Sequence, residues 1–152
     1  MDTLPAWLVD NPVGTTIRPE AVRNRLAESS DWETTARALM LLGDDLPALP
    51  SAERTDTNRL HGCQASVWVV HAYDAQSDRL YVNCDSDARV VKGLLACILC
   101  GYNGQSPEAV QAFDAKAFLQ SLQLDNYLAS ERRNGLLAMI GKVRMLAHRY
   151  AA

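Results

Sequence analysis

The segment from Ala88 to Tyr102 constrains the fold more than any other, because it has a helical pattern and is apolar on nearly every side. A helix of this kind has to be buried, whereas a surface helix keeps one polar face. We therefore expect residues 88–102 to form the central helix of the domain, ended by glycine and asparagine at 101, 103 and 104. Its apolar positions are Val90, Val91, Leu94, Leu95, Ile98 and Leu99.

Two stretches before this helix predict an antiparallel hairpin. Residues 64–73 are rich in valine and aromatic side chains, and residues 79–84 alternate between apolar and polar side chains. The polar residues between the two stretches are typical of a turn. Residues 59–61 are candidates for a further short strand just before the hairpin.

Helices are predicted on both sides of the hairpin, which makes the fold class α+β. Ser30 and Glu33 fit the capping-box pattern at the start of one of these helices. Asp85, Ser86 and Asp87 are expected to cap the central helix and to place negative charge at its positive end. Besides the central helix, the predicted helices lie at 19–29, 30–43, 106–113, 114–122 and from Ser130 to near the C-terminus.

The length of 152 residues is sufficient for one domain with a substantial core. Residues 1–16 contain two prolines, a glycine and little periodicity, so we expect an extended or loosely packed arm, followed by a single domain at 17–152. The net charge of −3 argues against nucleic-acid binding, and no apolar run is long enough to cross a membrane. The N-terminus does not resemble a targeting peptide. We therefore expect a cytoplasmic protein whose four cysteines are free thiols.

Cys63 is the candidate catalytic nucleophile. It follows Gly62 and directly precedes the predicted strand, so its thiol lies at a flexible turn that a partner can reach. From its position alone, a structural role and a reactive role of this cysteine have about equal weight. Gly62 favours the reactive role, because it lets the backbone rearrange and adds no side chain that would block a partner. We expect a sheltered resting position, with the thiol mostly buried between its loop and the helix after Asp87.

Cys97 and Cys100 form a C-x-x-C pair, a motif that binds metal or carries out redox chemistry in other settings. Here the pair lies in the last turns of an apolar helix, where the helix dipole has the opposite sign to the one that activates a thiol. A zinc site would need two more ligands, and Cys84, His61 and His71 are scattered along the chain. We therefore expect both cysteines to be core residues, and we expect no metal site.

Two further features remain open to more than one interpretation. His61, two residues before Cys63, is a candidate base or proton donor, but alternating strand spacing alone would also put both side chains on one side of the turn. Arg132 and Arg133 lie at the start of the last predicted helix, where the dipole disfavours cations. We therefore expect these arginines to serve a surface or a partner.

Several separated motifs, in one order, resemble the SufE family of sulfur acceptor proteins. The similarity extends from about Ile17 to the C-terminus, which makes it more specific than any single motif. It implies a fold shared with IscU-type scaffolds, a three-stranded antiparallel sheet with helices packed around it. The motifs are Trp32, Leu46-Pro47-Ala48-Leu49, Gly62-Cys63-Gln64, Val67-Trp68-Val69-Val70, Asp85-Ser86-Asp87-Ala88, Val90-Val91-Lys92-Gly93-Leu94 and Arg132-Arg133-Asn134-Gly135-Leu136-Leu137-Ala138-Met139-Ile140.

The resemblance also implies a function. SufE-like proteins accept sulfur as a persulfide from a pyridoxal-phosphate-dependent cysteine desulfurase (SufS-like or CsdA-like), stimulate that enzyme, and hand the sulfur to a downstream scaffold for iron–sulfur cluster assembly. The persulfide-carrying cysteine of the family falls on Cys63, and Gly62 and Gln64 match its neighbours. An acidic residue of the family falls on Asp87 and an arginine on Arg132, which implies that these two residues take part in partner binding.

The same resemblance implies that the chain has no cofactor of its own, because the pyridoxal phosphate belongs to the desulfurase, and that it has no independent turnover. It transfers no role to His61. Two alternatives stay open. A scaffold of IscU-like fold that binds an iron–sulfur cluster or zinc would need several converging thiolates, such as Cys63 and Cys84. A thiol hydrolase would pair Cys63 with His61 or His71.

Overall fold

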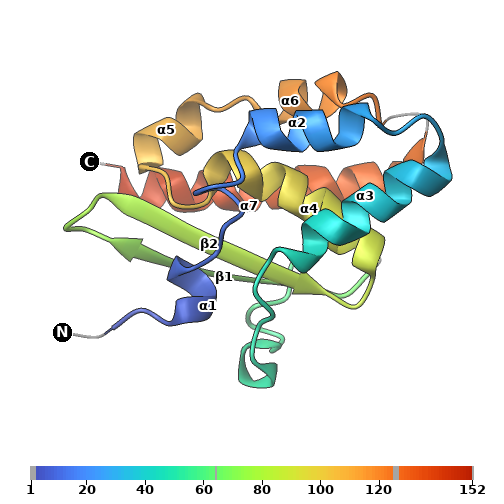
Figure 1. Cartoon of the computed structure of the whole chain (residues 1–152). Helices are drawn as coiled ribbons and strands as arrows, with labels where there is room; N and C mark the ends of the chain where they lie inside the picture. The colour runs from blue at the N-terminus through green and yellow to red at the C-terminus, as the bar shows by residue number, and fades with distance from the viewer. Residues whose placement is uncertain (1–2, 64, 125–126, 152) are drawn as a thin grey trace.

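A computed structural model describes residues 3–63, 65–124 and 127–151. An antiparallel hairpin forms one side of the molecule and most of the helices cover one of its faces (Figure 1). The fold class is therefore α+β, as predicted. No helix in the described part of the chain is long and apolar enough to cross a membrane. The elements are α1 (Ala6–Val9), α2 (Pro19–Ala27), α3 (Trp32–Asp44), the 3₁₀ turn η1 (Ser51–Glu53), β1 (Val67–Asp74), β2 (Arg79–Ser86), α4 (Arg89–Tyr102), α5 (Pro107–Ala112), α6 (Ala115–Ser121) and α7 (Ser130–Tyr150).

The predicted three-stranded sheet is wrong, because the sheet formed by the described residues has two strands, β1 and β2. The expected additional strand is reduced to a single bridge between Arg59 and Trp68. Beside this bridge the backbone N–H of Leu60 donates a hydrogen bond to the carbonyl of Val67 at 2.9 Å. The chain then turns away at Gly62, whose φ of +97° is incompatible with an extended strand. The pairing therefore stops just before Cys63.

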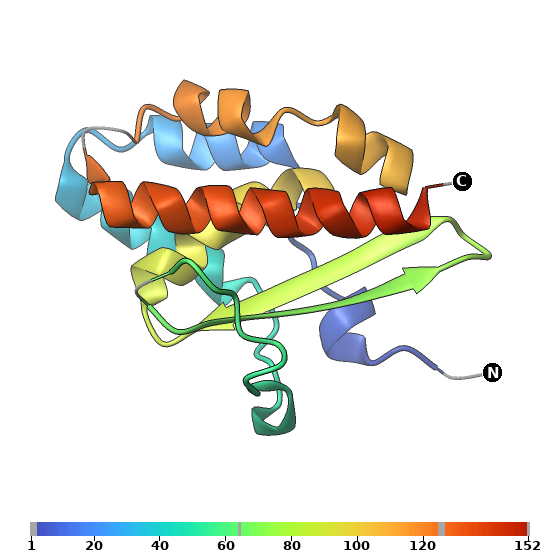
Figure 2. The ribbon, with the colours of Figure 1, turned by 180° about the vertical axis from the view of Figure 1, so that it is seen from behind.

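Side chains of the hairpin alternate between its two faces, and both faces are covered. One face contributes to the main core beneath the helical layer, whereas the other carries a smaller cluster with α1. In Figure 2, α7 and α1 lie on opposite sides of the strands. The face toward the helices includes Val67, Val69, Val82 and Cys84, and the smaller cluster includes Leu8, Leu49 and Val70.

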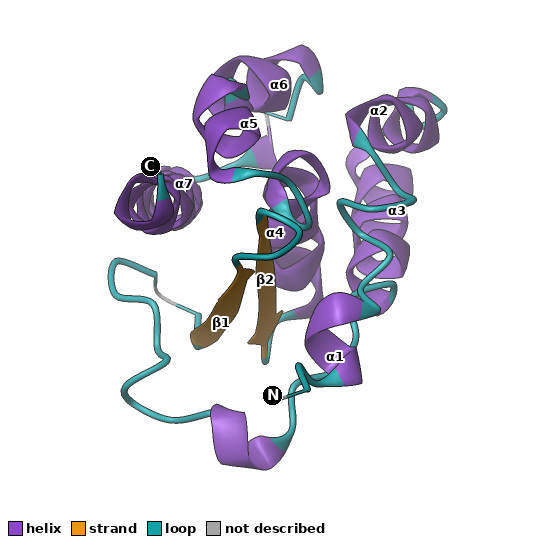
Figure 3. Cartoon of the chain, turned by 90° about the vertical axis from the view of Figure 1, so that its left-hand side faces the viewer, coloured by secondary structure: helices purple, strands orange, loops and turns teal. Residues whose placement is uncertain are grey.

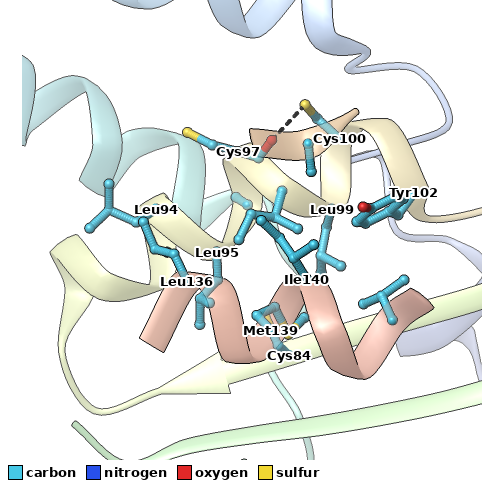
Figure 4. Packing of buried hydrophobic residues seen from close by; sticks show 14 of the residues in the cluster. Cys84, Leu94, Leu95, Cys97, Leu99, Cys100, Tyr102, Leu136, Met139 and Ile140 are labelled. Carbon is cyan, nitrogen blue, oxygen red and sulfur yellow. Dashed lines mark hydrogen bonds between the residues drawn. The ribbon is translucent and has the colours of Figure 1, made fainter. Parts of the chain in front are cut away.

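The helix α4 is the buried centre of the fold, as predicted, and every residue from Gly93 to Tyr102 is buried. Seen nearly along the strands, α3 lies on one side of α4 and α7 on the other (Figure 3). The backbones of α3 and α4 are in contact, because a Cβ atom on Gly43 would lie 2.9 Å from the backbone nitrogen of Gly93. On the other side, Met139 and Ile140 of α7 pack with α4 in the core (Figure 4).

The N-terminal segment is docked on the domain, so the expectation of an extended or loosely packed arm is wrong for residues 3–16. Val13 is completely buried. The side-chain amide of Asn83 donates to the carbonyl of Trp7 at 2.8 Å, and that of Asn103 donates to the carbonyl of Val13 at 2.9 Å. These buried amides satisfy backbone carbonyls that would otherwise lose their hydrogen bonds to water. The segment therefore belongs to the folded unit.

Two of the predicted helix caps are wrong. The cap of α3 is Asp31 and not Ser30, and Thr34 takes the place expected for Glu33 in a reciprocal capping box. The helix α4 has Ala88 as its N-cap and no side-chain cap, because β2 continues through Asp85 and Ser86. The hydroxyl of Ser86 accepts a hydrogen bond from the backbone N–H of Ala88 at 3.2 Å, whereas Asp85 and Asp87 lie next to Arg54, as described below.

Candidate functional site

Cys63 lies between the turn at Gly62 and the start of β1, and it rests on the first turns of α7. Its Sγ atom is 3.8 Å from the carbonyl oxygen of Gly135, a distance compatible with a weak S–H donor. A Cβ atom on Gly135 would approach this sulfur to 3.0 Å. The absence of a side chain at position 135 therefore makes the space in which the thiol lies. Reasoning from the sequence did not assign Gly135 to the site; the sequence shows a glycine in the first turns of a predicted helix, but not which residue packs against it.

The Cys63 thiol borders a cavity of about 170 Å³. Its walls are mostly apolar and come from the start of α4 and the start of α7. A water molecule occupies about 30 Å³ in the liquid, so the cavity has room for an additional sulfur atom on Cys63. The predicted shelter between the loop and the helix after Asp87 is present, although the thiol is half-buried and not mostly buried. The lining residues are Cys63, Ala65, Ala88, Val91, Leu94, Leu95, Glu131, Arg132, Gly135 and Leu136.

Burial raises the pKa of the Cys63 thiol above its ordinary value. We expect alkylation of Cys63 by iodoacetamide to be slower at pH 7 than that of a free cysteine, because only the thiolate reacts. Its rate should keep rising with pH above about 8.5, where a free cysteine begins to level off. Mass spectrometry of the alkylated protein after short exposures at each pH measures this profile. The protein unfolded in urea supplies the reference profile of a free cysteine. If the alkylation rate of the folded protein stopped rising at a lower pH than in this reference, the description of a sheltered thiol would be wrong.

The other three cysteines are buried in the core, as expected for Cys97 and Cys100 (Figure 4). The Cys100 thiol donates to the carbonyl of Cys97 at 3.0 Å. Burial raises the pKa of Cys84 and of Cys100 to about 12 each, so both stay protonated. Among the residues that the structure describes, no group of three His, Cys, Asp or Glu side chains could hold a metal ion. The several converging thiolates that a cluster scaffold needs are therefore not found among the described residues.

The remaining predicted site residues do not all meet at Cys63. Arg132 lines the cavity, whereas His61 is exposed and faces a separate groove between its loop and α7. The pairing of Cys63 with His61 therefore has no support in the geometry. Gln64 lies outside the described residues. Asp87 is exposed, and its carboxylate lies 3.8 Å from the guanidinium of Arg54.

Asp85, which the sequence suggested as a cap, is instead a buried ionic centre behind the site. Its carboxylate accepts hydrogen bonds from the backbone N–H of Leu49 at 3.1 Å and from Arg54 at 2.9 Å, and Lys92 lies at 3.2 Å. Burial by itself would raise the pKa of this carboxyl group. The N–H donors of Leu49 and Ser86 and the charge of Lys92 outweigh it and lower the pKa. The centre ties the loop after α3 to the junction of β2 and α4.

We expect this centre to make the protein sensitive to acid. The pKa of Asp85 is lower in the folded protein than in the unfolded chain, where it is about 3.9. The contribution of Asp85 to the free energy of unfolding is therefore complete above the unfolded-state pKa, and it is lost as the pH falls through the folded-state pKa. Asp85→Asn should lower the free energy of unfolding at pH 7 by about 2 kcal/mol and flatten its decline below about pH 5. Urea unfolding across pH 3 to about 7 measures both. Asp31→Asn is the control, because the pKa of that exposed cap is also lowered, first by the N–H of Thr34. A larger flattening by Asp31→Asn would contradict the assignment.

The chain is similar to a protein family, to individual relatives of that family and to a solved structure of the same fold. The family model of the SufE domain, described as an Fe-S metabolism associated domain, matches residues 20–147. The sulfur acceptor protein CsdE of Escherichia coli is 34% identical over 129 residues, which cover 85% of this chain and 87% of CsdE. An uncharacterised SufE-like protein of Rhizobium meliloti is 35% identical over 116 residues, which cover 75% of this chain and 83% of that protein. A solved structure of a hypothetical protein from Thermus thermophilus shares the fold with a TM-score of 0.64, at 19% identity and with 97% of each chain covered. The chain therefore belongs to the SufE family.

Proposed function

We propose that this chain is a sulfur acceptor, in which Cys63 takes up sulfur as a persulfide from a pyridoxal-phosphate-dependent cysteine desulfurase and hands it on toward iron–sulfur cluster assembly. One observation carries the proposal: a half-buried thiol borders an apolar cavity that has room for one more sulfur atom. Membership of the SufE family and the similarity to a protein named as a sulfur acceptor support it.

The transfer is a thiol–disulfide exchange in which the donor persulfide, R–S–SH, takes the part of the disulfide. The Cys63 thiolate attacks the outer sulfur, and a new S–S bond forms on Cys63. The S–S bond of the donor breaks, and the desulfurase cysteine leaves as a thiolate. The proton lost by Cys63 balances the one that the leaving thiolate can take up, so the step needs no oxidant or reductant.

In this proposal the thiol has two states with different reactivity. Inside it, burial raises the pKa of Cys63 and keeps the resting thiol protonated. We infer that the turn at Gly62 carries Cys63 out to the donor, where solvent restores an ordinary thiolate fraction. On return, the apolar walls would shield the new persulfide from water and from cellular thiols.

In this proposal the chain needs no cofactor, because the pyridoxal phosphate is held by the desulfurase, and it has no turnover of its own. A reducing cytoplasm is the compartment that we propose, in line with the four free thiols.

The test is incubation of the protein with a purified cysteine desulfurase and L-cysteine, followed by peptide mass spectrometry without reductant. We expect the mass of one added sulfur atom on the peptide that contains Cys63. Sulfur on Cys84, Cys97 or Cys100 instead, or none at all, would overturn the proposal.

Arg132 is proposed to contact the desulfurase, together with Asp87. Arg132 is exposed at the rim of the cavity, and it takes part in none of the salt bridges between described residues. Its place near the positive end of α7 gives no stability benefit. We expect Arg132→Ala to weaken association with the desulfurase by about tenfold and to leave the melting temperature nearly unchanged. Arg37→Ala, at an exposed position on α3, is the matched control for calorimetric titration and thermal unfolding. Unfolding without a change in affinity would make Arg132 a structural residue.

A further inference from the structure

The charge of the chain is unevenly distributed. The helix α7 carries five arginine and lysine residues and a single glutamate, a net charge of +4, whereas the whole chain carries −3. The remaining residues therefore carry a net charge of −7, opposite in sign to the net charge of α7. Such a distribution favours a partner surface that is acidic where it meets α7.

The solvent-facing side of α7 also carries an apolar stripe among its charged residues. Leu137, Gly141 and Met145 follow each other at intervals of four residues, which places them along one side of the helix. Leu137 is 46% exposed and Met145 is 47% exposed. A Cβ atom on Gly141 would have nothing within 4 Å, so the fold gives no packing reason for glycine there. Glycine in the middle of an exposed helix is destabilising, but it allows another chain to approach closely.

Beside this stripe lies a groove of about 440 Å³ between α7, β1 and the segment that precedes Cys63. Figure 2 shows this segment, in green, running beneath α7. The groove has Gly141 and Met145 on the helix side, and its basic side chains are Arg59, His61, His71 and Lys142. Its described lining residues include no carboxylate. None of the salt bridges between described residues involves Arg59 or Lys142.

The positive potential of the groove acts on a residue inside it. The pKa of His71 is lowered, first by burial and then by the charges of Lys142 and Arg149. An anionic group in the groove would therefore meet positive charge from Lys142 and Arg59 that no salt bridge between described residues compensates, beside the imidazole of His71, whose Nε2 lies 3.4 Å from the hydroxyl of Tyr150. An apolar side chain next to it would find Met145 and the open surface at Gly141.

We propose that this groove is a docking site for an acidic segment of a partner protein, with one apolar side chain of that segment seated over Gly141 against Met145. The wall formed by residues 57–61 leads directly into the turn at Gly62, so the occupant contacts the base of the loop that carries Cys63. The site is separate from the cavity at Cys63, and the proposal does not depend on sulfur acceptance by that cysteine.

The test is selection from a random synthetic octapeptide library on the immobilised full-length protein at about 0.1 M salt, where surface charges still interact. We expect the retained peptides to be enriched in aspartate and glutamate around one apolar residue. Lys142→Glu and Gly141→Leu, two substitutions in α7 outside the core, should each reduce this enrichment by about fivefold or more. Lys116→Glu on α6 makes the same charge change at an exposed position outside the groove and should leave the enrichment unchanged. Amide NMR shifts with a retained peptide should fall on residues 57–61 and 138–145.

Three results would overturn the proposal. The first is the absence of acidic enrichment. The second is an equal loss in Lys116→Glu, which would mean nonspecific attraction to positive charge. The third is that Gly141→Leu leaves peptide selection unchanged. If it then abolishes self-association in sedimentation, the stripe binds a second copy of the chain, and if it abolishes binding to vesicles of phosphatidylcholine and phosphatidylglycerol, the stripe binds a lipid surface.

Discussion

Replacing Cys63 with serine is expected to abolish sulfur acceptance and stimulation of the desulfurase while the fold stays intact. A serine hydroxyl is almost fully protonated at neutral pH and does not act as a sulfur nucleophile, so persulfide formation should fall by at least about a hundredfold. Within the described part of the chain the thiol has one hydrogen-bonding contact, a long one of 3.8 Å to the carbonyl of Gly135, and serine is close to cysteine in size, so the substitution should barely change the free energy of unfolding. Persulfide mass spectrometry and desulfurase turnover measure the first effect, and urea unfolding measures the second.

The buried cysteines provide the matched controls. Cys84→Ala and Cys97→Ala remove sulfur atoms that are completely buried, so they should reduce stability through lost packing and leave sulfur acceptance intact. If Cys63→Ser still stimulated turnover and Cys97→Ser did not, the choice of Cys63 as the acceptor would be wrong. The alternative of a cluster scaffold would also regain weight, because it needs a thiolate from the core.

Local sequence patterns predicted the parts of the fold that depend on local physics. The apolar character of residues 88–102 identified α4 as the buried helix, because a helix without a polar face has no stable exposed position. The alternation in residues 79–84 identified β2, because successive side chains of a strand point to opposite faces of the sheet. Helices α5 and α6 lie within the predicted ranges 106–113 and 114–122, and Ser106 and Asp114 cap them. In each case the side chains that decide the structure are neighbours in the sequence.

The predictions failed where partners distant in the sequence decide the outcome. Asp85 looks like a helix cap, but Leu49 and Arg54, more than thirty residues away, draw it into a buried ionic centre. The expected third strand pairs for one bridge only, because the positive φ of Gly62 turns the chain toward α7. No local pattern contains the contacts of Asp85, and Gly62 suggested backbone freedom without indicating that the pairing ends there.

One part of the candidate site could be predicted from the sequence and another part could not. The run Gly62-Cys63 identified the thiol, and its position before a strand identified a reachable turn. The space that the thiol occupies could not be predicted, because it depends on Gly135, seventy-two positions later in the chain. Helix glycines that lack a local explanation are thus a useful signal in this chain, and two others, Gly93 and Gly141, give opposite predictions.

Gly93→Ala is expected to be among the most destabilising single substitutions in the chain. A Cβ atom on Gly93 would overlap the carbonyl oxygen of Leu39 and lie 2.5 Å from its carbonyl carbon. These are backbone atoms of α3, so no change of side-chain rotamer relieves the clash and the two helices have to move apart. We expect a loss of about 3 kcal/mol in the free energy of unfolding and a fall of roughly 10 °C in the melting temperature, measured by urea and thermal unfolding.

Gly141→Ala is the matched control, because it adds the same methyl group to a helix interior with nothing within 4 Å. It should raise the free energy of unfolding by about 0.5–1 kcal/mol, since alanine has the higher helix propensity. Opposite signs for the two substitutions would mean that backbone contact between α3 and α4, and not helix propensity, is the reason for glycine at position 93. A neutral or stabilising Gly93→Ala would show that the two helices are not packed as closely as described, and the position of α4 above the Cys63 cavity would then have to be revised.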